Sequence, residues 1–184
     1  MTRIFLALTS CSTLLLIAAF VLGLSIGDPT ARDAAVQLWV SYHILTALAG
    51  LVFASLVHAL FLTYFMGTGR WMEETAGAYS LPNHWRRENQ SLKYRILLAI
   101  SGAFVLLLAT GAFGTAADPA SPVGFQGWAG LSAATIHLLL ASITVAVNLL
   151  VNVWELQAIQ RNSRLIEEVL AEVKRIRTER GLPV

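Results

Sequence analysis

Three of the four histidines in this chain lie within long apolar segments, where an imidazole is an unusual side chain. His43 and His58 lie fifteen residues apart in the run SYHILTALAGLVFASLVHALF, and His137 lies in a second apolar run. Neutral imidazole nitrogens can ligate haem iron, relay protons or hydrogen-bond to a neighbouring helix. The fourth, His84, lies in the polar segment SLPNHW and is predicted to be solvated. The chemistry open to the other three depends on the medium around them.

The composition predicts that this medium is a membrane. The 184 residues are 56% hydrophobic and 13% charged, whereas ordinary soluble domains are about 25% charged. Four segments reach the length of about 20 apolar residues that a spanning helix needs. We favour a retained first span over a signal peptide, because its apolar run is longer than that of a signal peptide. Residues 1–160 are therefore expected to form an all-α, four-transmembrane-helix bundle with spans at about 4–26, 36–66, 96–117 and 128–154.

The placement of the basic residues predicts the orientation. Twelve of the thirteen lysines and arginines fall at the N-terminus, between the second and third spans, or after the fourth span. Basic residues concentrate on the cytoplasmic side, so both termini are predicted to be cytoplasmic (N-in/C-in), in an integral multi-pass protein of a bacterial cytoplasmic membrane. The sequence pI of about 9.0 then reflects topology, and nucleic acid is not expected as a partner.

Two segments are expected outside the bilayer. Residues 67–95 are predicted to form a cytoplasmic loop, with the second helix ending at Gly67. Residues 161–184 are predicted to form a cytoplasmic amphipathic helix that extends the fourth span. Ile159, Ile166 and Val173 have heptad spacing. Two interpretations stay open: packing on the inner loop or membrane surface, or a short coiled coil that joins a homodimer or a membrane-complex partner through residues 156–180.

The spans have polar interior faces. Polar side chains that face lipid find no partners, so the polar stripe that follows His137 along the fourth helix must point inward. It comprises Thr144, Asn148, Asn152 and Glu155, the last of which directly follows the predicted span. His58 and Asn148 are expected at matching depths near the inner boundary. His43 and His137 are expected in the outer half, at depths of about 6 and 13 Å, a mismatch of about 7 Å.

One sharp hypothesis is that His43 and His137 are axial ligands of a single b-type haem, with His58 a weaker ligand candidate. Arg32 is then the only basic candidate near an outer haem, since Arg70, Lys93 and Arg95 could meet propionates only at an inner site.

The arrangement resembles small membrane cytochromes b, in which histidines spaced along one helix are paired with histidines of another helix. The resemblance covers only these histidines and the four-helix layout, and it implies haem binding and electron transfer. A two-haem member would carry a second histidine in the fourth span near Asn148 or Asn152, where this chain has asparagine.

Three function classes follow. We favour a non-enzymatic structural or interaction subunit of a membrane complex; the alternatives are a haem-b-binding electron-transfer subunit and a small transporter. Transport is disfavoured because the predicted spans contain no Asp, Glu, Lys or Arg and are not interrupted by proline. An enzyme acting on its own is not expected, because the sequence shows no nucleophile–base or carboxylate pair. The single cysteine, Cys11, excludes a multi-cysteine metal site, so haem iron is the one metal considered.

Overall fold

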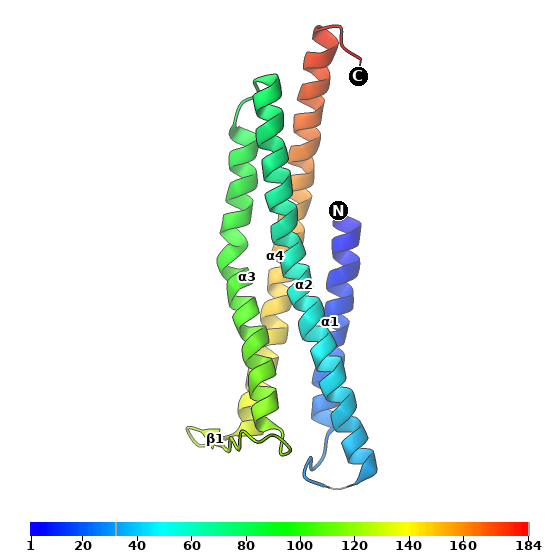
Figure 1. The fold of residues 1–184 in the computed structure, drawn as a ribbon, viewed down its shortest axis with the longest axis vertical. Helices are drawn as coiled ribbons and strands as arrows, with labels where there is room; N and C mark the ends of the chain where they lie inside the picture. Colours follow the sequence, from blue (N-terminus) through cyan, green and yellow to red (C-terminus); the bar gives the residue numbers. More distant parts are fainter. Residues whose placement is uncertain (32, 184) are drawn as a thin grey trace.

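The computed structural model describes residues 1–31 and 33–183 and shows four long helices running side by side as an extended bundle (Figure 1). All four helices are long and apolar enough to cross a membrane, so the chain is a multi-pass membrane protein with an all-α bundle. The helices are α1 (Thr2–Ser25), α2 (Ala34–Tyr79), α3 (His84–Ala117) and α4 (Ala133–Glu179), and two short strands, β1 (Gly127–Trp128) and β2 (Leu131–Ser132), precede α4. The expected span 4–26 nearly coincides with α1, and the expected spans 36–66 and 96–117 lie within α2 and α3.

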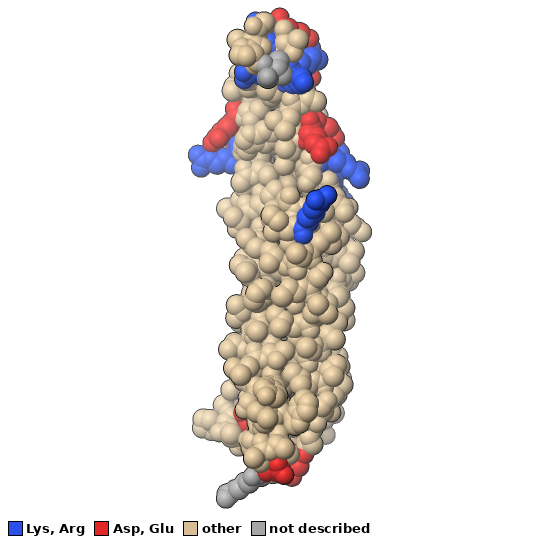
Figure 2. Space-filling model, turned by 90° about the vertical axis from the view of Figure 1, so that its right-hand side faces the viewer, with Lys and Arg blue, Asp and Glu red and all other residues tan. Residues whose placement is uncertain are grey.

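The helices pack mainly as two pairs, α1 with α2 and α3 with α4, and the pairs meet through α2–α3 and α1–α4 contacts. The main core lies at mid-height, where Phe61, Phe65, Ile100 and Ile159 are almost completely buried. Outward-facing leucines and valines are exposed, as expected for helices whose solvent is lipid. The space-filling view shows a broad band without surface charge between two charged ends (Figure 2). This band corresponds to the membrane-spanning part.

The two ends of the bundle differ, and we name them for what they carry. The basic end contains residues 67–95 of α2 and α3 and residues 156–183. The hairpin end contains the α1–α2 connection and the β1–β2 hairpin. Both chain termini lie toward the basic end (Figure 1). α1 is the shortest helix, so α2, α3 and α4 extend beyond it at the basic end.

The expected end of the second helix at Gly67 is wrong. α2 continues through Gly67 to Tyr79, and α3 begins at His84, so only a four-residue turn separates them. A glycine inside a helix costs only about 1 kcal/mol relative to alanine, and the buried Met72 on this extension contributes more than that. The helix ends instead at Ser80, whose left-handed conformation (φ 56°) precedes Leu81 and Pro82.

The expected start of the fourth span at Trp128 is also wrong. Trp128 lies in β1, and α4 begins five residues later at Ala133. Gly127 has φ 133°, and an added Cβ there would lie 2.0 Å from the Leu131 carbonyl oxygen, so only glycine allows this tight hairpin. Ser132 then caps α4 by accepting a hydrogen bond from the Thr135 backbone N–H at 3.2 Å.

α4 runs without a break from the hairpin end to Glu179. In its last part Leu165 and Val169 are buried in one cluster with Met72 and Leu81. This continuation therefore packs on the α2–α3 extensions of the same chain. Self-association through residues 156–180 stays a prediction.

Candidate functional site

His43 on α2 and His137 on α4 lie next to each other in the half of the bundle near the hairpin end. Their ring centres are 6.2 Å apart and their planes are inclined at 80°. The expected depth mismatch between the two histidines is absent, because that expectation measures the depth of His137 from Trp128, which lies before α4. His137 is only four residues from the true start of α4, and α2 begins farther toward the hairpin end (Figure 1).

Each ring rests on a glycine of the adjacent helix. A Cβ added to Gly23 of α1 would lie 2.9 Å from Cε1 of His43, and one added to Gly114 of α3 would lie 2.9 Å from Cε1 of His137. Real Cβ atoms do not approach so closely, so a side chain at either glycine would displace the imidazole. All four helices thus contribute to this pair, two with histidines and two with glycines.

The ring nitrogens of the pair are incompletely used. Nδ1 of His43 lies 2.9 Å from the carbonyl oxygen of Ala19, to which it must donate. That hydrogen bond leaves Nε2 of His43 as the nitrogen with a free lone pair. Nδ1 of His137 is buried and makes no well-aligned hydrogen bond with the described residues, although the Thr110 backbone of α3 lies within reach of the imidazole. A buried polar atom without a partner is uncommon in a native structure and is a candidate ligand or proton acceptor.

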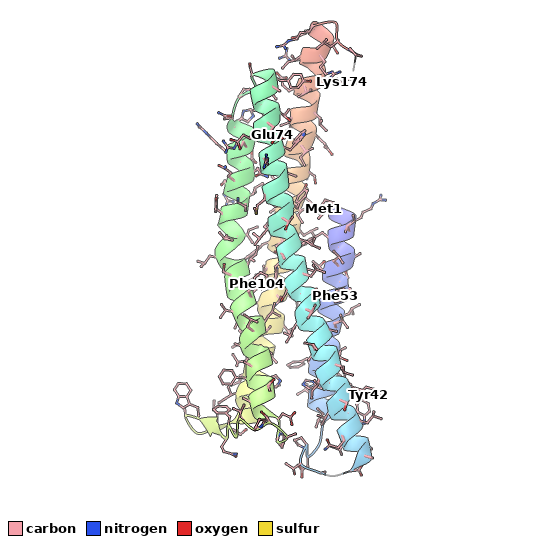
Figure 3. All side chains as sticks on the ribbon, viewed as in Figure 1. Met1, Tyr42, Phe53, Glu74, Phe104 and Lys174 are labelled. Carbon is pink, nitrogen blue, oxygen red and sulfur yellow. The ribbon has the colours of Figure 1, made fainter. Side chains whose placement is uncertain are left out.

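His58 lies deeper in the bundle, and both of its ring nitrogens are hydrogen-bonded to side chains. Nδ1 lies 2.9 Å from Oε1 of Glu155, and Nε2 lies 3.1 Å from Oδ1 of Asn148. His58 and Glu155 have no exposed surface, and Asn148 is 2% exposed. The ring of Phe104, labelled in Figure 3, covers the imidazole edge-on with ring centres 5.7 Å apart. We call His58, Asn148 and Glu155 the polar triad.

The hydrogen bonds of the polar triad restrict where hydrogens lie between His58, Asn148 and Oε1 of Glu155, whereas Oε2 of Glu155 is buried without a hydrogen bond to the described residues. Nδ2 of Asn148 donates to the Thr144 carbonyl at 2.9 Å, so Oδ1 must face His58. Nε2 of His58 therefore carries a hydrogen. One more proton lies between Nδ1 and Oε1, either on the imidazole or on the carboxyl group. In both forms the pair is neutral as a whole, which suits a site without water.

Other members of the predicted polar stripe fall into separate roles. The hydroxyl of Thr144 lies 2.6 Å from that of Thr110 on α3. Asn152 is only partly buried and takes no part in the hydrogen bonds of His58 among the described residues. His84 is exposed, which confirms its prediction, and its ring lies against Trp85. Arg32, the proposed partner for an outer haem, lies outside the described residues.

Sequence reasoning paired His58 with Asn148 correctly but missed Glu155 as its second partner. Glu155 lies on the predicted polar stripe, but the predicted fourth span ends at Trp154, so the prediction leaves this carboxylate outside the membrane. The signal was available, because Glu155 follows Asn148 by seven residues, two turns along the same stripe. Gly23 and Ala19 gave no comparable signal, since their importance comes from the side chain of another helix.

A third buried polar cluster, also missed, lies at the basic end. Nδ2 of Asn89 donates to Oδ1 of Asn162 at 2.8 Å and to Oγ1 of Thr68 at 3.0 Å. Asn162 also donates to Thr68 at 3.0 Å. These side chains link α2, α3 and α4 through neutral groups and offer neither a nucleophile nor a titratable acid. We therefore assign them a packing role.

Comparison of the chain with protein-family models, with curated protein sequences and with solved structures finds no match. What the histidine pair and the polar triad do is therefore inferred from their own geometry.

Proposed function

We propose that this chain is a membrane electron-transfer subunit that binds one haem b, with His43 and His137 as its two axial ligands. The observation that carries the proposal is the juxtaposition of two imidazoles from α2 and α4 with ring centres 6.2 Å apart. Of the three function classes that the sequence leaves open, this one uses the feature of the bundle that packing explains least.

The separation of the rings suits ligands on opposite sides of one metal. A metal–imidazole bond is about 2 Å long and the ring centre lies about 1 Å farther, so two such ligands have centres about 6 Å apart. Direct packing of two imidazoles also allows this distance. A metal between the rings would also give a partner to an imidazole whose buried Nδ1 has no well-aligned hydrogen bond among the described residues.

The surroundings of His43 match those of a metal ligand. A ligating histidine usually donates its second ring N–H to a carbonyl or carboxylate, which fixes the ring and its tautomer. The Ala19 carbonyl does this for Nδ1 of His43. Gly23 and Gly114 let both rings sit against the neighbouring backbone. The chain thus supplies two oriented imidazoles, and a haem held by them would supply a one-electron carrier.

The orientation belongs to the same proposal. The basic end faces the cytoplasm, because basic residues concentrate there and cytoplasmic segments are enriched in them. The haem then lies in the outer half of the membrane. His58 has no free ring nitrogen in the polar triad, which supports the packing role of that residue and argues against a second, inner haem.

The test is a haem titration of the full chain in mild detergent, followed by absorbance. We expect the wild-type protein to bind about one equivalent, and His43→Ala and His137→Ala to lose tight binding. His84→Ala is the matched control, because His84 is exposed on α3 and far from the pair in sequence. Its binding should equal that of the wild type.

Two results would overturn the proposal. The first is absence of stoichiometric binding by a folded wild-type protein supplied with excess haem. The second is equal binding by His137→Ala and His84→Ala, which would place the haem elsewhere. Circular dichroism and gel filtration of each variant separate loss of the ligand from loss of the fold.

A further inference from the structure

A groove of about 550 Å³ lies between α2 and α3, at the start of the basic end, and is lined from both helices. Its volume is within the usual range of small-molecule sites. Glu74, labelled in Figure 3, marks its position along α2. No part of the haem proposal uses this groove, and none of its lining residues belongs to the histidine pair or the polar triad.

The groove changes character along the bundle axis. At the side toward the apolar band it is lined by Phe65, which is buried, and Met66, which is 64% exposed. One helical turn farther toward the basic end α2 contributes Arg70, and Arg86 of α3 pairs with Glu73 beyond it. Lys93 of α3 lies at the side toward the apolar band, because α3 runs antiparallel to α2 and Asn89 faces Gly69. An occupant that matches both ends must therefore be apolar on one side and polar on the other.

The charged lining has an excess of positive charge. Three basic and two acidic side chains contribute to it. Both acids are already engaged: Nε of Arg70 lies 2.8 Å from Oε1 of Glu74, and Nη2 of Arg86 lies 2.9 Å from Oε1 of Glu73. Lys93 also lines the groove and lies over the ring of Tyr94, 4.6 Å from its centre. Because each of the two arginines is paired with a glutamate, the Lys93 ammonium group gives the groove its net positive charge.

The two arginines retain unused donors. A guanidinium has five N–H groups in a planar fork, and the contacts to Glu73 and Glu74 use only one nitrogen of each. The remaining N–H groups and the Lys93 ammonium are the donors that a phosphate group binds best. The two carboxylates offset the charge of the two arginines, whose remaining N–H groups stay available as donors.

From this arrangement we infer that the groove binds an anionic glycerophospholipid. The phosphate contacts Lys93, Arg70 and Arg86, and the acyl chains leave past Phe65 and Met66 into the bilayer. The apolar side of the groove favours a lipid over free phosphate, because it is lined by Phe65 and by the exposed Met66. Basic clusters beside a spanning helix are a known mode of anionic-lipid recognition.

Native mass spectrometry of the full chain tests the inference. The protein is equilibrated in detergent with equal amounts of phosphatidylglycerol and phosphatidylcholine, and retained lipid is counted. We expect retained phosphatidylglycerol to exceed phosphatidylcholine. Each cation removed should weaken that preference about fivefold, in Lys93→Gln and further in Arg70→Gln/Lys93→Gln. Lys93→Arg should keep it.

Arg164→Gln is the matched control, because Arg164 is exposed on α4 and does not line the groove. Its lipid preference should be that of the wild type. Equal retention of both lipids by the wild type, or an equal loss of preference in Arg164→Gln, would overturn the inference. Displacement of phosphatidylglycerol by millimolar inorganic phosphate would also overturn it, since the groove would then be a free-anion site.

Discussion

The histidine pair and the polar triad are built from the same two helices, α2 and α4, yet they hold their imidazoles in opposite ways. In the triad, both ring nitrogens of His58 are hydrogen-bonded to side chains that have almost no exposed surface. In the pair, His43 makes one backbone hydrogen bond and Nδ1 of His137 makes none with the described residues. Fifteen residues along α2 separate a histidine with both ring nitrogens hydrogen-bonded, His58, from one with a single hydrogen bond, His43.

This difference shows that a buried histidine alone does not indicate a ligand site. What distinguishes the two sites is whether the second helix supplies an acceptor. α4 offers the triad an amide and a carboxylate, but it offers His43 only another imidazole. An imidazole with both nitrogens hydrogen-bonded ties its helices together, although Oε2 of Glu155 is itself buried without a hydrogen bond to the described residues. An imidazole with a free nitrogen remains able to bind a metal.

The largest expected effect comes from breaking the polar triad. Glu155→Ala leaves His58 buried with an unpaired Nδ1, and removing one partner of a buried pair costs about 3–5 kcal/mol. His137→Ala in the haem-free protein should cost only about 1 kcal/mol, because no hydrogen bond of Nδ1 is lost. Thermal unfolding of both variants in the same detergent measures the contrast. Equal destabilisation would mean that the two histidine sites are alike.

The second effect concerns the glycine beneath His137. Gly114→Ala forces its new methyl group against the imidazole, since the added Cβ would lie 2.9 Å from Cε1. Overpacking of this kind costs about 1–3 kcal/mol, and haem affinity should fall with it. Gly102→Ala, in the same helix with open space around the added Cβ, should be neutral or stabilising by up to about 1 kcal/mol. Unchanged haem affinity in Gly114→Ala would show that the ring can move freely.

The smallest effect contrasts the buried triad with an exposed ion pair at the basic end. The Arg161 guanidinium, at 2.9 Å, and then the Trp85 indole N–H hold the pKa of the Glu168 carboxyl below its ordinary value. Stability from a lowered pKa is present above the ordinary glutamate pKa and is lost as the pH falls through the lowered one.

Glu168→Gln should therefore lower the melting temperature slightly at pH 7 and by less at pH 3, with a free-energy change below about 1 kcal/mol because the pair is exposed. Glu167→Gln, an exposed neighbour in α4, serves as control and should match the wild type at both values. A loss that is as large at pH 3 as at pH 7 would contradict the electrostatic explanation.

The sequence was sufficient for the four helices, because twenty-residue apolar runs leave few alternatives. The sequence also predicts that His58 and Asn148 meet, because each lies on the interior face of its helix and the two lie at matching depths. It did not reveal that α2 and α3 continue as helices through 67–95, because Gly67 resembles a helix end until the packing of Met72 is known. The hairpin at Gly127 likewise requires three-dimensional knowledge of the Leu131 backbone.

The candidate site likewise has parts that the sequence predicts and parts that only the structure reveals. The types and faces of His43 and His137 were visible in the sequence, and their relative depth was not, because it depends on where α4 begins. The contacts with Gly23, Gly114 and the Ala19 carbonyl were also hidden. Periodicity reports which face of one helix points inward, but it does not report which residue of another helix it meets.

The most direct test of the difference between the two sites is a dithionite-reduced minus oxidised absorbance spectrum, recorded on His137→Ala and His58→Ala purified side by side with the wild type. Our account predicts a sharp b-type α band in the wild type, retained in His58→Ala wherever that variant folds and lost in His137→Ala. A folded, colourless wild type, or a band lost in His58→Ala and kept in His137→Ala, would contradict it.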